Sequence, residues 1–233
     1  CAGRLSRQAS PASKTRNPVV PQMALNDKQI TARLYDDTDK APLDPFEVFE
    51  AWFAAAAETE PNDPNAMVLA TVDADGLPDL RAMLLNGRDA RGFVFYTNLK
   101  SAKGRELAAN PKAALNFHWK VLRRQIRIRG DAELVPPDEA DAYFVTRPRG
   151  SQLGAHASFQ SQPLENRGEL LGRVAALTVK YGVTGPVPRP DHWSGYRVVP
   201  RTIEFWKDGK FRLHDRMLFT RDGDGWTRRR LSP

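Results

Sequence analysis

The stretch EFWKDGKFRLHDRMLF, from Glu204 to Phe219, predicts a β-hairpin. An Asp-Gly pair, Asp208-Gly209, stands between two runs rich in aromatic and aliphatic residues, which is the strongest short-range sign of a hairpin turn. If this pair is a two-residue turn, Trp206 pairs with Phe211. Because side chains alternate across a strand, three basic residues then share the face opposite Trp206. These are Arg212, His214 and Arg216.

Two guanidiniums and an imidazole on one face favour an anionic or heteroaromatic ligand over a metal, because arginine is always cationic while histidine both donates and accepts. A solvated strand face is the plainer alternative, and the pattern alone leaves both open. The sequence contains no CxxC, HExxH, GxSxG or GxxxxGK[ST] motif, and its four histidines lack the spacing of metal ligands. Because no metal-ligand spacing is found, we expect no metal site. The sequence also shows no nucleophile beside a general base.

The composition is typical of a soluble globular protein. The chain has 233 residues, 41% hydrophobic and 27% charged, which is enough for one sizeable core. The longest apolar run, residues 51–57, is too short to span a bilayer. Cys1 is the only cysteine, so no intrachain disulfide can form. We expect a cytoplasmic protein without a membrane anchor.

The net charge of +7 is unevenly distributed. Residues 1–26 carry four basic side chains and no acidic one, which leaves +3 on residues 27–233. A nucleic-acid binder would show a clustered basic stripe, and none stands out. Residues 1–26 are predicted to be a disordered tail, with a transit peptide as the alternative and Met23 as a candidate native start. Residues 27–233 are predicted to form a single domain.

The rest of the pattern predicts consecutive strands with a few helices between them. Strands are expected at 66–72, 80–85, 93–97, 113–119, 125–135, 196–199, 202–207, 210–220 and 226–231, and helices at 44–57, 101–110, 137–144 and 165–181. Asp75-Gly76 and Asn86-Gly87 are predicted turns, and Asp44 with Glu47 a capping box. This order favours a mainly β (α+β) fold, an antiparallel barrel-like domain with helices packed outside.

Two further stretches could bind an anion. In FVFYTNLKSAKGRE, residues 93–106, a strand leads into a helix with Lys103 in its first turn, where free backbone N–H groups and the helix dipole favour an anion. The alternative is an ordinary surface lysine. RPRGSQLGAHASFQSQ, residues 147–162, follows neither a strand nor a helix period. Its arginines and small polar residues suit a phosphate, although composition favours a solvated loop.

Seven pieces in this order resemble the pyridoxamine/pyridoxine 5′-phosphate oxidase family of FMN enzymes. They are DPNAMVLATVD, RAMLL, FVFYTN, SAKGREL, the Gln125 of RRQIRIRG, AYFVTRPRGSQLGAHASFQS and EFW…RLHDR. The resemblance runs from about Arg33 to Pro233. It implies an FMN-binding split β-barrel and a homodimer with flavin at the subunit interface. It also implies oxidation of pyridoxamine and pyridoxine 5′-phosphates to pyridoxal 5′-phosphate by O2, with H2O2 as the second product.

The resemblance also implies which residues bind. The FMN contacts would be Arg81, Ala82, Met83, Leu84, Leu85, Tyr96, Thr97, Lys103, Gln125, Gln160, Ser161, Trp206 and Arg216, with Lys103 on the phosphate. The substrate contacts would be Arg33, Tyr35, Asn86, Tyr143, Arg147, Ser151, Arg212, Leu213 and His214, with Arg212 and His214 as the catalytic pair beside the reacting carbon. The resemblance places both Trp206 and Arg216 beside FMN, but the predicted two-residue turn places them on opposite faces of the hairpin. Either a bulge shifts the register, or the two residues contact the flavins of different subunits.

The chain departs from the family at several positions. Asn86 stands where the family usually has lysine, and the missing cation could weaken substrate binding roughly ten- to hundredfold unless Arg88 compensates. Ala102 replaces a frequent arginine, while Ser194 and His156 are departures without an assigned consequence. Asn86 favours a second hypothesis, a sister flavin oxidase acting on another substrate such as a phenazine precursor. A non-catalytic protein that binds flavin or pyridoxal phosphate is the third.

Overall fold

The computed structural model describes residues 25–233. Most of the predicted tail lies outside the described residues, but its last two positions belong to the fold. Asn26 caps helix α1 (Asp27–Leu34) in a reciprocal capping box with Gln29, and Leu25 packs against the core. The last two residues of the predicted tail, Leu25 and Asn26, are therefore part of the described fold.

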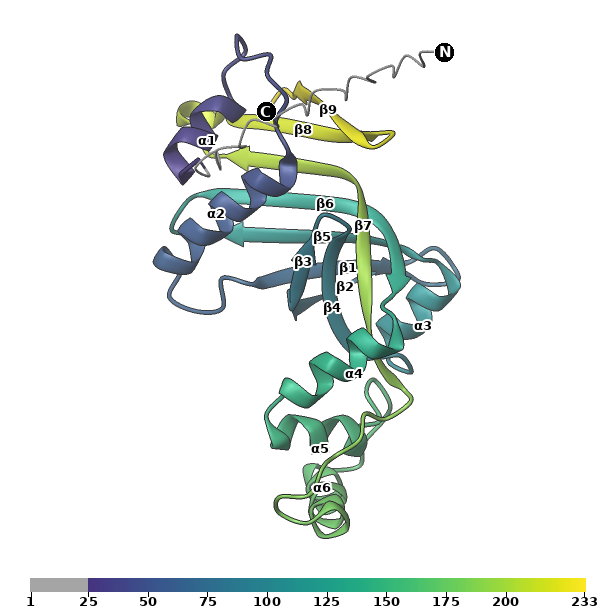
Figure 1. Cartoon of the computed structure of the whole chain (residues 1–233). Helices are drawn as coiled ribbons and strands as arrows, with labels where there is room; N and C mark the ends of the chain where they lie inside the picture. The colour runs from purple at the N-terminus through teal and green to yellow at the C-terminus, as the bar shows by residue number, and fades with distance from the viewer. Residues whose placement is uncertain (1–24) are drawn as a thin grey trace, which may run out of the picture.

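One curled antiparallel sheet forms the body of the molecule (Figure 1). Its nine strands are β1 (Ala66–Val72), β2 (Pro78–Leu84), β3 (Gly87–Asp89), β4 (Gly92–Asn98), β5 (Lys112–Trp119), β6 (Arg124–Leu134), β7 (Trp193–Lys207), β8 (Asp215–Asp222) and β9 (Gly225–Arg230). The order is β2-β1-β5-β6-β7-β4-β3, with β8 added to β7 and β9 to β8. The predicted antiparallel, barrel-like fold is confirmed.

Strand β7 belongs to two parts of this sheet. Its first half pairs with β4 and its second half with β8, while β6 follows it on the other side. The register with β6 shifts between Arg129 and Gly130, which leaves Arg201 without a β6 partner. A Cβ atom on Gly130 would lie 1.9 Å from the Val199 carbonyl oxygen, so this bulge requires glycine. The sequence predicted two strands here, and the structure has one long strand bent by a bulge.

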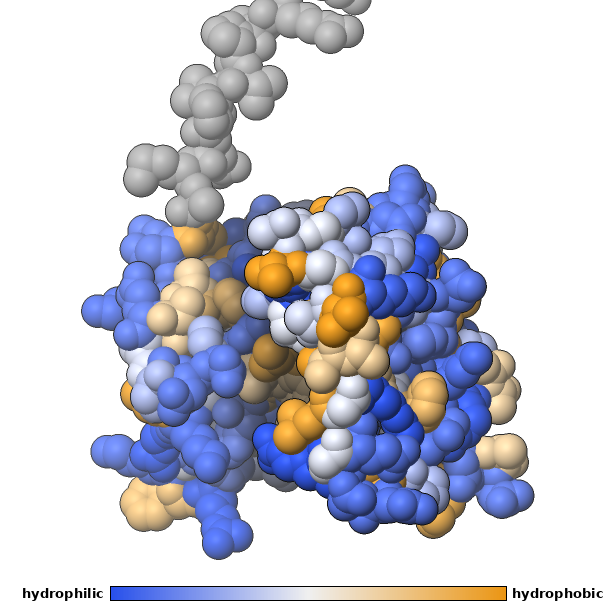
Figure 2. All heavy atoms as spheres, turned by 90° about the horizontal axis from the view of Figure 1, so that it is seen from below, coloured by the Kyte–Doolittle hydropathy of each residue, from blue (hydrophilic) through white to orange (hydrophobic). Residues whose placement is uncertain are grey.

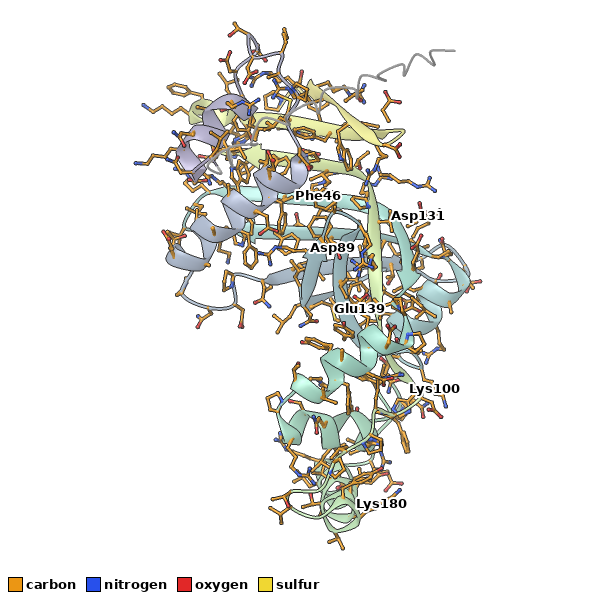
Figure 3. The ribbon with its side chains drawn as sticks, viewed as in Figure 1. Phe46, Asp89, Lys100, Asp131, Glu139 and Lys180 are labelled. Carbon is orange, nitrogen blue, oxygen red and sulfur yellow. The ribbon has the colours of Figure 1, made fainter. Side chains whose placement is uncertain are left out.

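Helix α2 (Pro45–Thr59) covers the concave side of the sheet and builds the core. Phe49 and Trp52 are fully buried. The Phe49 ring lies 4.9 Å from that of Phe93, and the Trp52 ring 5.3 Å from that of Phe205. Burial of each such side chain contributes about 1.5–3 kcal/mol. Phe46, labelled at the start of α2 in Figure 3, stacks on Phe93 at 5.4 Å.

Local signals at the turns were only partly decisive. Asp44 caps α2 by accepting from the Phe46 N–H, and the capping box predicted with Glu47 is not formed. Asp75-Gly76 is the predicted turn, with Gly76 at φ +87°. Asn86-Gly87 is not a hairpin turn, because the chain passes there from β2 into β3 and turns back later, at residues 90–91.

Three helices project from one end of the sheet between β6 and β7 (Figure 1). They are α4 (Pro137–Thr146), α5 (Arg149–Ala157) and α6 (Arg167–Tyr181). Helix α5 occupies the stretch predicted as a loop, and that prediction was wrong. Only Leu153 and Ala157 of α5 are buried, so glycine and serine mask its period. Seen from below, hydrophobic residues line a hollow near the middle of an otherwise mainly hydrophilic face (Figure 2).

The predicted two-residue hairpin turn was also wrong. Trp206 pairs with Arg216, and residues 208–214 form a longer loop containing a short 3₁₀ turn (Lys210–Arg212). Gly209 has φ −127°, and a Cβ atom there would lie 1.9 Å from the Leu213 carbonyl oxygen. Glycine is therefore required by crowding within the loop and not by a tight turn. Arg212 and His214 lie in this loop and do not share a strand face with Arg216.

Candidate functional site

A cavity of about 330 Å³ lies between β2, β4, α5 and the start of β7. We call it the aromatic pocket. Of the residues predicted to bind FMN or substrate, it is lined by Met83, Tyr96, Thr97, Arg147, Ser151 and Gln160. Residues far apart in the sequence are thus brought together in one cavity. Trp193 and Ser158 also line it and were not predicted as site residues.

Three nearly parallel aromatic rings stack at one side of the aromatic pocket, and two of them, Tyr96 and Trp193, line it. The Tyr96 ring stacks on Tyr143, with centroids 4.0 Å apart, and on Trp193, with centroids 5.2 Å apart. Tyr96 pairs with Gly195 across β4 and β7, and a Cβ atom on Gly195 would lie 2.8 Å from the Tyr96 ring. The stack therefore depends on a residue without a side chain. Burial raises the pKa of Tyr96 to about 12, which keeps its hydroxyl protonated at neutral pH.

Arg147 brings a charge to this side of the aromatic pocket. Its guanidinium carbon lies 4.7 Å from the Trp193 ring centroid. Among residues 25–233, two buried side-chain atoms lack a hydrogen-bond partner, Arg147 Nη1 and Thr97 Oγ1, and both residues line the aromatic pocket. Burial lowers the pKa of Arg147, yet arginine stays charged. Because a buried N–H of a charged group is costly without an acceptor, this arrangement suits an anionic group.

Asn86 joins two members of the ring stack. Its Nδ2 donates to the Tyr143 hydroxyl at 2.7 Å, and its Oδ1 accepts from the Tyr96 N–H at 3.3 Å. Arg88 does not supply the cation that Asn86 lacks. Its guanidinium makes a two-point ion pair with Glu50 and lies 4.0 Å from the Phe53 ring, on the α2 side of the sheet. The predicted compensation is therefore wrong.

Arg81 and Lys103 form a second group of cations at the start of helix α3 (Ala102–Ala109). Ser101 caps this helix by accepting from the Gly104 N–H. Lys103 is only 6% exposed, so it is not an ordinary surface lysine. Its pKa is lowered by burial first and by Arg81 second. Two cations beside a helix N-terminus suit a phosphate, as the sequence predicted for Lys103.

A third group lies on the outward face of the sheet. Gln125, Trp206 and Arg216 are direct partners across β6, β7 and β8, so their side chains share one face. Their neighbours Phe205 and Met217 are buried in the core, so this shared face points outward. Placing Trp206 opposite Arg216 removes the conflict raised by the predicted turn, through a longer loop and not a bulge. We call these three residues the tryptophan row.

His214 lies over the end of this row. Its ring centroid is 4.6 Å from that of Trp206. His214 Nδ1 is 3.2 Å from the Gly209 N–H donor and 3.2 Å from Asp208 Oδ1. The neutral ring accepts from Gly209, which leaves the proton on Nε2, while the protonated ring donates to Asp208. Arg212 stands in the same exposed loop, at φ +63°.

The aromatic pocket and the tryptophan row lie at opposite ends of β7 (Figure 1). Trp193 begins the strand and Trp206 is its second-last residue. Thirteen steps of extended strand, at ~3.3 Å each, separate the two residues along β7. One chain therefore does not bring Arg212 and His214 to its own Arg147.

Other predicted residues lie outside the aromatic pocket. Arg33 is paired with Asp39, and the Tyr35 hydroxyl donates to the Phe205 carbonyl oxygen at 3.2 Å. Leu85 is buried in the core, while Leu213 is 70% exposed. Ala82 and Leu84 point outward from β2, and Ser161 follows Gln160 at φ +67°. In the described part of the chain, no group of three or more potential metal ligands occurs.

Comparisons with known proteins agree with this geometry. Residues 53–181 match the family described as pyridoxamine 5′-phosphate oxidase, and residues 193–233 match the pyridoxine 5′-phosphate oxidase C-terminal dimerisation region. The chain belongs to the pyridoxamine 5′-phosphate oxidase family. None of the helices described within residues 25–233 has the length and apolar character needed to cross a membrane.

Curated relatives and a solved structure cover most of the chain. The pyridoxine/pyridoxamine 5′-phosphate oxidase of Caulobacter vibrioides is 62% identical over 190 residues, 82% of this chain and 85% of the relative. That of Mesorhizobium japonicum is 54% identical over 210 residues, 90% of this chain and 100% of the relative. PhzG from Burkholderia lata 383, solved with tetrahydrophenazine-1-carboxylic acid, is 32% identical. It covers 85% of this chain and 97% of its own, with a TM-score of 0.79.

Proposed function

We propose that this chain is an FMN-dependent oxidase that converts pyridoxamine and pyridoxine 5′-phosphates to pyridoxal 5′-phosphate with O2, producing H2O2. The observation that carries the proposal is the half-buried guanidinium of Arg147, which lies over Trp193 of the Tyr96–Tyr143–Trp193 stack and whose buried Nη1 has no hydrogen-bond partner within residues 25–233. A phosphate ester on an aromatic ring matches both features. High identity to curated pyridoxine/pyridoxamine 5′-phosphate oxidases supports the same substrate.

The residues present fit FMN. Arg81, Lys103 and the N-terminus of α3 would hold its phosphate, and Met83 and Thr97 in the aromatic pocket would contact the remainder. Thr97 Oγ1 is buried without a partner, as expected for a group that meets a polar ligand atom. When bound, FMN would supply the redox chemistry, which is hydride acceptance and reoxidation by O2.

The protein's own residues bind and orient the substrate. Arg147 and Ser151 are proposed to bind its phosphate. Tyr143 would join them, because its hydroxyl already accepts from Asn86 and keeps its own proton free to donate. Asn86 therefore acts through Tyr143 in this proposal. Holding the ester at several points fixes the reacting carbon in place, which is a large part of what a positioned site contributes to rate.

Arg212 and His214 are proposed to serve the aromatic pocket of a partner subunit. They lie at the far end of β7 from their own chain's pocket, within the match to a dimerisation region. Leu80 and Leu84, on the same outward face as the tryptophan row, are 68% and 44% exposed and would be covered by a second chain. His214 Nε2 would then be available to donate to the substrate.

The test is anaerobic. Protein loaded with FMN is mixed with pyridoxamine 5′-phosphate, and the visible flavin absorbance is followed. We expect rapid bleaching and recovery when air is admitted, with one H2O2 formed per turnover. FMN that stays bound and oxidised with both phosphate esters would contradict the proposal. Bleaching only by a reduced phenazine-1-carboxylic acid would favour a sister enzyme resembling PhzG. A cytoplasmic location stays a prediction.

A further inference from the structure

The side chain of Arg81 is already held by three neighbours. Its Nη1 donates to the Thr71 hydroxyl, and its Nη2 donates to both the Asp79 and Glu106 carboxylates. Each terminal nitrogen of a guanidinium carries two hydrogens, so Nη2 has none left. The two-nitrogen fork that best binds a phosphate is therefore not open to a ligand unless one carboxylate leaves.

The two carboxylates differ in how firmly they are held. The Glu106 side chain is 11% exposed and also accepts from Thr71. The Asp79 side chain is 55% exposed and, apart from Arg81, accepts within residues 25–233 only from the adjacent Leu80 N–H. Ion pairs of exposed side chains contribute little, whereas breaking a buried one is costly. Asp79 is thus the partner that an incoming anion can displace.

Lys103 belongs to the same charge cluster. The groups that influence its charge are Arg81, Glu106 and Asp79. Two cations are thereby matched by two carboxylates, so the cluster has no net charge. Position 102, the first residue of α3, is alanine and adds no cation. An anion that reaches this site meets Lys103 and Arg81, and the charge of Arg81 is already offset in part by the exposed Asp79 carboxylate.

We propose that Asp79 competes with the FMN phosphate for Arg81 and so limits how strongly this chain prefers FMN to riboflavin. The inference rests on the cofactor assigned in the proposed function. On binding, the phosphate takes the position of the Asp79 carboxylate at Arg81, while Glu106 and Thr71 keep the guanidinium oriented. Asp79 is a specificity-determining residue that lowers affinity for the phosphorylated flavin and leaves that for the unphosphorylated one unchanged.

The experiment compares FMN with riboflavin, which lacks the phosphate. The apoprotein is titrated with each flavin by fluorescence at low salt. Asp79→Asn and Asp79→Ala are expected to lower the Kd for FMN about three- to tenfold, which is the range for releasing a partly exposed charge-assisted pair. The Kd for riboflavin should change by less than about twofold. The gain should shrink in 1 M salt, since exposed charges are screened.

Asp75→Asn is the matched control. Asp75 is exposed in the same β1–β2 hairpin and forms no ion pair within residues 25–233. Its substitution therefore removes one negative charge without changing a contact of Arg81. Equal tightening in the control and the Asp79 variants, or an unchanged FMN-to-riboflavin ratio in both Asp79 variants, would overturn the inference. If the wild-type chain binds FMN but oxidises neither ester, the proposed activity is contradicted and this inference is not. If no variant binds FMN, the proposed activity and this inference are both contradicted.

Discussion

The two ends of strand β7 differ in how their polar side chains are paired within the chain. At the Trp193 end, a guanidinium lies over the last ring of a three-ring stack, and its buried Nη1 has no partner within residues 25–233, so the polar group is in place before any ligand arrives. At the Trp206 end, Arg216 is paired with Glu204, and Arg212 stands in an exposed loop. The first end is preorganised by its own chain, whereas the second is proposed to meet substrate only in the pocket of a partner subunit.

Mixed dimers give the sharpest test of this contrast. A chain carrying Arg147→Met and a chain carrying both Arg212→Ala and His214→Ala should each be almost inactive as homodimers. If each site takes Arg147 from one subunit and the loop from the other, random mixing makes half of the dimers mixed, each with one intact site. About a quarter of wild-type turnover should return.

Activity after co-refolding or co-expression of the two chains measures this effect. Arg167→Met in place of Arg147→Met is the control, because Arg167 is exposed at the start of α6. FMN content should stay near wild type in the chain that carries both loop substitutions, since Arg212 and His214 are proposed to orient substrate. A mixture that remains inactive although dimers have formed would show that both ends act within one chain.

The next effect concerns Asn86 at the preorganised end. Asn86→Lys should add a cation beside the aromatic pocket and lower the KM for pyridoxamine 5′-phosphate about tenfold, within the range for a charge-assisted contact. Asn86→Ala breaks the bond to the Tyr143 hydroxyl and should raise KM. An unchanged or raised KM for the lysine variant would mean that holding Tyr143 matters more than the added charge.

Gly195 tests how much the ring stack depends on close packing. A Cβ atom at position 195 would lie 2.8 Å from the Tyr96 ring and 3.1 Å from Val135, so Gly195→Ala must move the stack. We expect a loss of about 1–3 kcal/mol in the free energy of unfolding, the usual cost of overpacking. Gly172→Ala in helix α6 is the control, because nothing lies within 4 Å of its Cβ position. Denaturant unfolding measures both, and equal curves would show that the stack adapts freely.

Much of the fold was predictable because its signals are local. Ser101 before Lys103, and Asn110-Pro111 after it, mark the limits of α3 in sequence and in structure. The same boundary places Lys103 in the first turn of α3, which is why the sequence predicts an anion site there. The Asp208-Gly209 pair is equally local, yet it misled, because the register is set by Trp206 opposite Arg216. Tertiary pairing overrode turn propensity there.

The most informative site feature was not readable from the sequence. That Arg147 lies unpaired over a ring depends on Trp193, which follows it only after α5 and α6. Nothing in the arginine's neighbours along the chain distinguishes it from Arg149, which instead holds the carbonyl oxygens of Gly182 and Gly185. The resemblance to a family separated the two arginines, and the packing supplies the physical reason.

The smallest expected effect is on stability at the Lys103 cluster. Burial and Arg81 lower the pKa of Lys103, so folding opposes its charge. Lys103→Met should raise the Tm of the apoprotein by about 2–4 °C, the shift that ~1 kcal/mol produces in a chain of this size, while FMN binding weakens. Lys100→Met, at an exposed lysine close by in sequence (Figure 3), should change neither.

The sign of the pH dependence separates this cause from a change in packing. Between its lowered folded pKa and its ordinary unfolded pKa, Lys103 binds more protons in the unfolded chain, so wild-type stability rises with pH across that window. The Tm advantage of Lys103→Met should therefore be full at neutral pH and shrink as the pH rises toward the ordinary lysine value. An advantage that stays constant over that range would attribute it to methionine packing and leave the charge of Lys103 without a cost to folding.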